Sequence, residues 1–390
     1  MTATCATAPV RRRLVYYLSG FDPRGARFYH QLYQSEAALQ QVVDGCRYEV
    51  SGRTHDGPHA TTWTVQAEAG EQRLETRYTF LGWDDIVRAH WPGRSAAIGA
   101  MPGFYWRYMV AGCLGQTFRC SPRFFWSLMA PIVFTAIALL LAATASLATA
   151  WLASHAGAGG WIALMLGLAV AAGTVALAVA VADRVRLPWV VRICLFTLQW
   201  GRTGPQPFEQ RWAAFADKIQ RDLAAYPADE VLVVGHSVGA AVAVAVVERW
   251  LTLNGGQPPR PGLVKLLTLG QLVPMLGLIP QAGWFRRQLA AVGEAEVPWL
   301  DYTAPSDPLS FALVDAFAAC GLASPARASY RVRSARLDRM FPPAAFAPLK
   351  RDAFRIHFQY LMSTRLPVPN SYFRLTAGSD PLETQIRHAA

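Results

Sequence analysis

The sequence predicts an α/β protein with a mostly parallel sheet and an inserted two-helix transmembrane hairpin. Four apolar residues at 231–234 run into a tight turn, and an Ala- and Val-rich stretch follows at 240–247. This order is typical of a buried parallel strand followed by a buried helix. In addition, no Asp, Glu, Lys or Arg occurs between Arg123 and Asp183, and that length accommodates two membrane-spanning helices.

The composition favours membrane lipid over nucleic acid as a partner. Hydrophobic residues make up 53% of the chain, charged residues only 16%, and the mean hydropathy is +0.19. These values indicate membrane segments. The net charge of +11 comes almost entirely from arginine, and no basic cluster is interleaved with stacking aromatic residues, so we expect anionic lipid and no nucleic acid. The six cysteines are scattered without a C-x-x-C pair, which indicates neither a zinc site nor a disulfide framework.

Periodicity places the elements of the first part of the chain. An apolar run at 14–18 predicts a buried strand, and a helix is expected at 26–43. Three segments that alternate polar and apolar residues predict a small antiparallel meander, and a short helix capped by Asp84 or Asp85 should follow it. The meander strands are expected at 46–50, 62–67 and 74–80.

The charge-free run separates this part from the rest of the α/β domain. An amphipathic helix at 208–226 leads into the strand at 231–234, and a closing helix is expected at 351–363. Further strands are expected at 263–269, 297–302 and 329–336. The predicted parts are 11–118 and 201–366 for the α/β domain, 124–182 for the hairpin and 367–390 for a polar tail.

The charge-free run itself predicts the membrane topology. Residues 124–153 and 161–182 are each long enough to cross a bilayer, and a Gly-rich turn joins them. Arginines flank both outer ends while the turn carries no charge, which places both ends in the cytoplasm. We therefore expect a multi-pass protein of a bacterial-type inner membrane, with its α/β domain, the part that carries any catalytic site, in the cytoplasm. The alternative is a pair of buried core helices.

The tight turn reads Gly235-His236-Ser237-Val238-Gly239. Between a strand and a helix, this motif resembles the nucleophile elbow of the α/β-hydrolase superfamily of serine esterases and lipases. Such an elbow holds its serine on a strained corner, and glycine is needed where a Cβ would collide with a neighbouring strand or helix. The resemblance covers about residues 11–81 and 201–366. The alternative is that residues 231–247, which lack charged side chains, form another membrane helix.

The resemblance implies a catalytic triad in the chain order serine, carboxylate, histidine. Ser237 is then the nucleophile, and the histidines that follow it are His357 and His388. His357 is the expected base because His388 lies in a polar stretch three residues from the end. His357 falls in a helical pattern well past the last strand, whereas the family's histidine usually follows that strand directly. An inert core histidine is therefore the competing interpretation.

The resemblance also implies an acid and an oxyanion hole. Asp307 is the expected acid because it follows a strand in a loop, and Asp301 and Asp315 are the alternatives. The implied oxyanion donors are the amides of three residues, namely Gly20, Phe21 and Val238. Gly20 and Phe21 lie in a loop that Asp22 and Arg24 could pin, although an ordinary Gly/Pro turn is the alternative there. His236 is expected to pack beside the elbow, pointing away from Ser237.

These expectations describe a membrane-anchored serine hydrolase that cleaves carboxylic esters through an acyl-enzyme, without a metal or an organic cofactor. The same residues would serve an acyltransferase or thioesterase, and a catalytically inactive membrane scaffold is the alternative from another class. A lipid-like substrate is expected from the hairpin and from residues 272–292. That apolar segment contains two prolines and Arg286-Arg287, and it predicts either an interfacial segment or a buried cap.

Overall fold

A computed structural model of the chain describes residues 9–206 and 208–387. His388 therefore lies outside the described residues. The chain divides into two compact units. Unit 1 comprises the chain up to Trp91, Gly115–Phe124 and the chain from Thr197 onwards, whereas unit 2 comprises Pro92–Leu114 and Phe125–Phe196.

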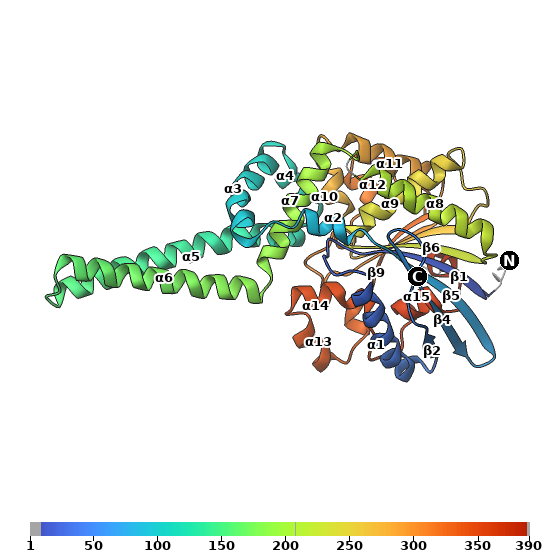
Figure 1. Cartoon of the computed structure of the whole chain (residues 1–390), viewed down its shortest axis with the longest axis horizontal. Helices are drawn as coiled ribbons and strands as arrows, with labels where there is room; N and C mark the ends of the chain where they lie inside the picture. The colour runs from blue at the N-terminus through green and yellow to red at the C-terminus, as the bar shows by residue number, and fades with distance from the viewer. Residues whose placement is uncertain (1–8, 207, 388–390) are drawn as a thin grey trace. The chain divides into compact units, whose positions relative to one another are not determined.

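Unit 1 is built on a nine-stranded sheet of order β2-β4-β5-β1-β6-β7-β8-β9, with β3 paired to β4 (Figure 1). Neighbouring strands from β5 to β9 along this order are parallel, while β2, β3 and β4 pair in antiparallel fashion. The prediction of an α/β protein with a mostly parallel sheet is therefore confirmed. The strands are β1 (Arg12–Leu18), β2 (Arg47–Val50), β3 (Thr54–His55), β4 (Ala60–Ala69), β5 (Gln72–Leu81), β6 (Glu230–His236), β7 (Val264–Leu269), β8 (Trp299–Thr303) and β9 (Tyr330–Ser334).

Helices cover both faces of this sheet (Figure 1). The central strands β1 and β6 are almost completely buried, which is why they contain near-continuous apolar runs. Successive side chains point to opposite faces. One face packs against α1 (Ala26–Asp44), α14 (Ala353–Phe358) and α15 (Tyr372–Ala377), and the other faces α8 (Glu209–Ala225), α9 (Gly239–Leu253) and α11 (Gly283–Glu294). Shorter helices are α2 (Asp84–Ala89), α4 (Cys113–Cys120), α10 (Val273–Gly277), α12 (Ala316–Ala319), α13 (Pro343–Leu349) and α16 (Leu382–Arg387).

The strand order reverses between β1 and β6. From β1 the chain proceeds toward β5 on one side, and from β6 it proceeds through β7, β8 and β9 on the other. In open parallel sheets, ligands bind outside the carboxyl ends of the strands at such a switch point. The loop after β1 and the turn after β6 therefore flank the place where this architecture favours a ligand site.

The apolar segment 272–292 is buried within the protein, so the interfacial interpretation is wrong. It forms α10 and α11, and Val273, Met275 and Phe285 have at most 1% of their surface exposed. The Arg286 guanidinium donates to the carbonyl oxygens of Gly277 and Ile279 at 2.8 and 2.9 Å, so it closes the turn between the two helices. The alternative, a buried cap, is what the structure shows. Apolar composition could not distinguish an interfacial segment from a buried cap, because the same apolar side chains are found in protein cores and in contact with the bilayer.

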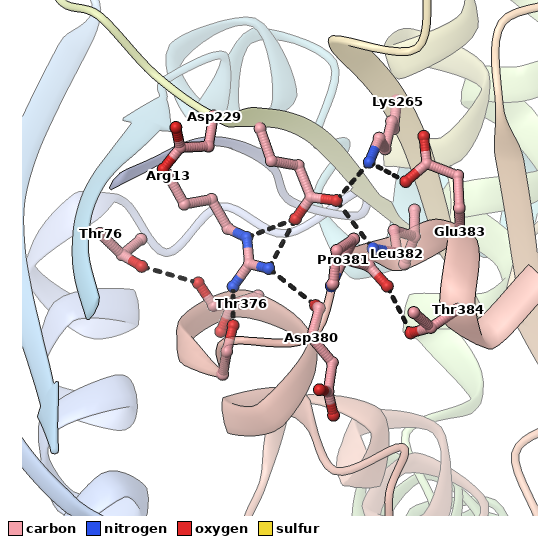
Figure 2. A network of polar contacts seen from close by, with 12 residues as sticks. Arg13, Thr76, Asp229, Lys265, Thr376, Asp380, Pro381, Leu382, Glu383 and Thr384 are labelled. Atoms are coloured by element: carbon pink, nitrogen blue, oxygen red, sulfur yellow. Dashed lines mark hydrogen bonds and ion pairs between the residues drawn. The ribbon is translucent and has the colours of Figure 1, made fainter. Parts of the chain in front are cut away.

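The expected polar tail is also wrong, because residues 367–390 include two helices that belong to the core. Side chains of α15 and α16, among them Phe373 and Ile386, are buried in the same cluster as strands of the sheet. The segment is further held by buried charges at the amino ends of the strands. Arg13 donates to the carbonyl oxygens of Gly378 and Asp380 (Figure 2).

Unit 2 contains α3 (Arg94–Val110), most of α5 (Pro122–His155), α6 (Gly160–Arg184) and most of α7 (Leu187–Thr203). Helices α5 and α6 are long and apolar enough to cross a membrane, and only 17% and 11% of their most apolar windows are buried. They lie side by side, since a Cβ on Gly167 would be 2.9 Å from the carbonyl oxygen of Ser146. Residues 92–114, which we expected in the α/β domain, cluster with these helices instead.

Candidate active site

Ser237 lies on the sharp turn between β6 and α9, at the carboxyl end of a central strand. Its φ is +57°, in the left-handed region that non-glycine residues rarely occupy. Such a conformation costs about 1–3 kcal/mol and persists only where the surrounding structure imposes it. Strain of this kind is the hallmark of a nucleophile elbow, and here it falls on the residue that the motif singled out.

The two glycines of the motif are required by close approach of the backbone. A Cβ on Gly239 would lie 2.3 Å from the carbonyl oxygen of Leu18, at the end of the neighbouring strand β1. A Cβ on Gly235 would lie 2.6 Å from the Cα of Ala240, in the following helix. Both separations are far below contact distance, so the expected reason for glycine at these positions is confirmed.

The structure brings His357 and Asp307 together. Asp307 lies in the loop after β8, and its Oδ2 accepts a hydrogen bond from Nδ1 of His357 in α14 at 2.8 Å. Its other oxygen accepts from the amide of Leu309 at 2.9 Å. Burial alone would raise the pKa of Asp307, but the charge of His357 and its hydrogen bond outweigh burial and lower that pKa. A buried, ionised carboxylate on Nδ1 is the arrangement that orients a histidine base.

Two further residues shape this pair and were not anticipated. The Tyr360 hydroxyl donates to the same Oδ2 of Asp307 at 3.0 Å. Gly270, at the end of β7, has a φ of +55°, and a Cβ there would be 2.8 Å from Cε2 of Tyr360 and 3.2 Å from Cε1 of His357. The missing side chain at Gly270 therefore provides the space in which Asp307, His357 and Tyr360 contact one another. The sequence carries no signal for this, because the three elements are far apart in the chain.

His236 does more than pack beside the elbow. Its Nε2 donates to the main-chain oxygen of His357 at 2.9 Å, and the two rings lie 4.8 Å apart between centroids. Burial, followed by the charge of His357, lowers the pKa of His236 to about 3, so its ring is neutral. His236 thus ties the strand that ends at Ser237 to the helix that carries the candidate base.

The alternative acids occupy other positions. Asp301 lies within β8, and its Oδ1 accepts a hydrogen bond from the Thr268 hydroxyl at 2.7 Å. Burial raises the pKa of Asp301 to about 8, so this carboxyl is protonated at neutral pH. Asp315 caps the N-terminus of α12 by accepting from the amides of Phe317 and Ala318. In the described part of the chain, neither carboxyl is hydrogen-bonded to His357.

Ser237 and His357 both border the end of β7. The amide of Ser237 donates to the carbonyl oxygen of Leu269 at 3.0 Å, and the next residue, Gly270, is the one that adjoins the His357 ring. Within the described residues no hydrogen bond joins the Ser237 hydroxyl to the imidazole. In unliganded enzymes such bonds are often long and shorten only when substrate binds. Only 4% of the surface of Ser237 is exposed.

The loop after β1 lies close to Ser237. A Cβ on Gly20 would lie 3.0 Å from the Cβ of Ser237 and 3.5 Å from its Oγ. Val238 begins the turn into α9. No hydrogen bond among the described residues uses the amide of Gly20 or of Val238, so both donors are available. Phe21 is buried, and its ring stacks on that of Trp91 at 5.4 Å.

The expected pinning of this loop is confirmed. Asp22 Oδ2 accepts from the Arg24 guanidinium at 2.7 Å and from the Tyr29 hydroxyl at 2.7 Å. Its other oxygen accepts from the amide of Arg24 at 2.9 Å. The Arg24 guanidinium also lies over the ring of Phe358, the residue after the candidate base, at 5.0 Å from its centroid. The loop after β1 and the helix of the base are thereby connected.

No protein-family model, curated protein or solved structure matches the chain. Among the residues that the structure describes, no group of three or more His, Cys, Asp or Glu is placed to hold a metal ion.

Proposed function

We propose that this chain is a membrane-anchored serine hydrolase of the α/β-hydrolase type that cleaves carboxylic esters. One observation carries the proposal. Ser237 is held at a φ of +57° on the β6–α9 turn, at the sheet edge where His357 and Asp307 form a buried hydrogen-bonded pair. A strained serine and an oriented imidazole at one carboxyl edge are the parts that acyl transfer needs.

In the proposed reaction, Ser237 Oγ attacks the carbonyl carbon of the ester while His357 Nε2 takes the hydroxyl proton. Asp307 keeps the proton of His357 on Nδ1 and stabilises the imidazolium that forms. The amides of Gly20 or Phe21 and of Val238 donate to the oxyanion. The alkoxy group leaves with the proton from His357, and water then attacks the acyl-enzyme by the same steps in reverse, which releases the acid and restores Ser237.

We further propose that α5 and α6 form a transmembrane hairpin and that the substrate is a lipid-like ester. Both helices meet the length and hydropathy of membrane spans and are mostly unburied. Arginines lie near both outer ends, while the turn between the helices is uncharged. The proposed preference for lipid rests on this anchor alone, since the segment 272–292 is buried. Esters presented in vesicles should therefore be cleaved in preference to soluble short-chain esters.

The test is labelling of the detergent-solubilised chain by a fluorophosphonate, which reacts with activated serines. Wild type should be labelled, and Ser237→Ala should lose both labelling and ester cleavage. Ser329→Ala is the matched control, because Ser329 is also buried but lies at the amino end of β9, away from the candidate site. Its hydroxyl donates to the carbonyl oxygen of Ala326.

Undiminished ester cleavage in Ser237→Ala would contradict the assignment of the nucleophile. If folded wild type is neither labelled nor active on esters, the inactive scaffold is the better interpretation. Product analysis with an added alcohol separates hydrolysis, which releases free acid, from acyl transfer to the alcohol.

A further inference from the structure

Unit 2 contains an apolar cavity of about 200 Å³ bordered by α3, α5, α6 and α7. Of the residues that line this cavity in the described part of the chain, Thr135 has the one polar side chain, and its hydroxyl donates to the carbonyl oxygen of Pro131 at 2.8 Å. The lining therefore offers almost no polar group to a ligand. Such a lining favours a hydrocarbon group over a polar ligand, because apolar surface is removed from water when the two meet.

The sequence explains why helices of unit 2 leave this space. Pro131 lies inside α5 and cannot donate the backbone hydrogen bond of a regular helix turn. Small side chains also line the cavity, among them Ala138 on α5 and Ala178 on α6. The cavity is also open at its rim, because the lining residues Leu139 and Val175 have 58% and 40% of their surface exposed.

A basic cluster lies beside one end of the cavity. The lining residues at that end, Ala182, Leu187 and Val191, are adjacent in sequence to Asp183, Arg186 and Arg192. The Arg94 guanidinium pairs with Asp183 at 2.5 Å, and Arg192 donates to the carbonyl oxygen of Pro92 at 2.9 Å. With Arg184, the cluster holds four arginines and one aspartate, a net charge of +3.

We propose that this cavity holds one acyl chain of an anionic membrane phospholipid, whose head group is bound by the arginines of the basic cluster. An apolar cavity that opens along two candidate membrane spans suits a hydrocarbon chain, and a net positive charge at its end suits a phosphate. A second protein helix would fill the apolar space without using that charge. The proposal rests on the membrane placement of α5 and α6, and it is independent of the chemistry at Ser237.

The first arm of the test fills the cavity. Ala178 lines it, whereas Ala176, on the same helix and exposed, does not. Purified wild type, Ala178→Phe and Ala176→Phe are incubated with vesicles of phosphatidylglycerol or of phosphatidylcholine with the same acyl chains. Bound lipid is then counted by native mass spectrometry from detergent. Wild type and Ala176→Phe should retain one phosphatidylglycerol, and Ala178→Phe should lower its occupancy at least about tenfold.

The second arm removes the charge. Arg94→Gln with Arg184→Gln should reduce the preference for phosphatidylglycerol over phosphatidylcholine about fivefold or more, while Arg107→Gln, an exposed arginine of α3, should leave it unchanged. Equal retention of the two lipids by wild type would overturn the proposal. So would unchanged retention by a folded Ala178→Phe, or the recovery of only detergent or free fatty acid. Ser237→Ala should retain the lipid as wild type does, so failure of the hydrolase assignment is recognised separately.

Discussion

At the scale of single residues, the site is governed by which protons its buried groups carry. Asp307 is ionised beside His357, whereas Asp301, inside the preceding strand β8, is protonated at neutral pH because burial outweighs its hydrogen bond from Thr268. His236 is neutral because it is buried beside another histidine. These three buried groups therefore differ in protonation state, and the predictions below test those states.

The two aspartates should respond differently to the same substitution. Asp307→Asn should lower kcat/KM for an ester about 10³- to 10⁴-fold, because an amide no longer holds the proton of His357 on Nδ1. Asp301→Asn should change kcat/KM less than threefold or so, since an amide resembles the protonated acid already present and its oxygen still accepts from Thr268. Steady-state kinetics of the two variants decides the matter. The reverse order of effects would make Asp301 the acid.

His236 should make the protein sensitive to mild acid. Its pKa is about 3 in the folded state and about 6.5 in an unfolded chain, so below pH 6.5 only the unfolded state gains the proton. The stabilising effect of a neutral His236 is thus present above pH 6.5 and lost as the pH falls, by about 2 kcal/mol between pH 6.5 and 4.5.

The measurement is urea unfolding in detergent across that range, for wild type and for His236→Gln, whose amide can still donate to the oxygen of His357. The free energy of unfolding of the variant should decline less steeply with acid, and the two curves should converge. Parallel curves would mean that the pKa of His236 is the same in the folded protein as in the unfolded chain.

At the scale of elements, the C-terminal segment completes the fold through buried charges. Glu230, at the start of β6, accepts from Arg13 of β1 and Lys265 of β7, each at 2.6 Å, and from the amide of Leu382 at 2.7 Å. Lys265 also pairs with Glu383 (Figure 2). All of these contacts lie at the amino ends of the strands, opposite the candidate site. They therefore bear on stability and lie away from the candidate site at the carboxyl edge.

Removing the charge of Glu230 should destabilise the protein strongly. Glu230→Gln leaves Arg13 and Lys265 buried without their carboxylate, and breaking a buried pair in this way costs about 3–5 kcal/mol. Glu209→Gln is the control, since Glu209 pairs with Arg249 at 3.3 Å on the surface and should change stability by less than about 1 kcal/mol. Thermal or urea unfolding measures both. Equal small effects would show that the network is dispensable.

At the scale of the whole molecule, the proposed topology can be tested from the turn between α5 and α6. Ala156 is exposed in that turn, and it is preferable to Gly157, whose φ of +85° disfavours a side chain. With the native cysteines replaced by serine, Ala156→Cys should react with an impermeant thiol reagent on intact cells, and Arg202→Cys should react only after permeabilisation. The reverse pattern would invert the orientation, and labelling of both in intact cells would contradict a cytoplasmic α/β domain.

The sequence by itself determined the features that depend on local pattern. The expected strands and the helix expected at 208–226 are present to within a few residues, because alternation and helical periodicity are properties of neighbouring side chains. The helix expected at 351–363 is shorter, since α14 ends at Phe358, and it does not close the fold. The glycines at 235 and 239 could also be explained in advance, since a tight strand-to-helix turn brings the backbone against its own helix and the adjacent strand. The two long apolar helices followed from an uncharged run that needs no partner to be recognised.

Only the tertiary structure decided which distant residues meet and which apolar segments are covered. The sequence favoured Asp307 over Asp301 because Asp307 follows a strand, but only the path of the chain after β8 brings it to His357, fifty positions further along. Residues 272–292 and the C-terminal helices are buried because other elements happen to pack on them. Removal of apolar surface from water is favourable whether protein or lipid covers that surface. Composition alone therefore cannot tell which of the two covers an apolar segment.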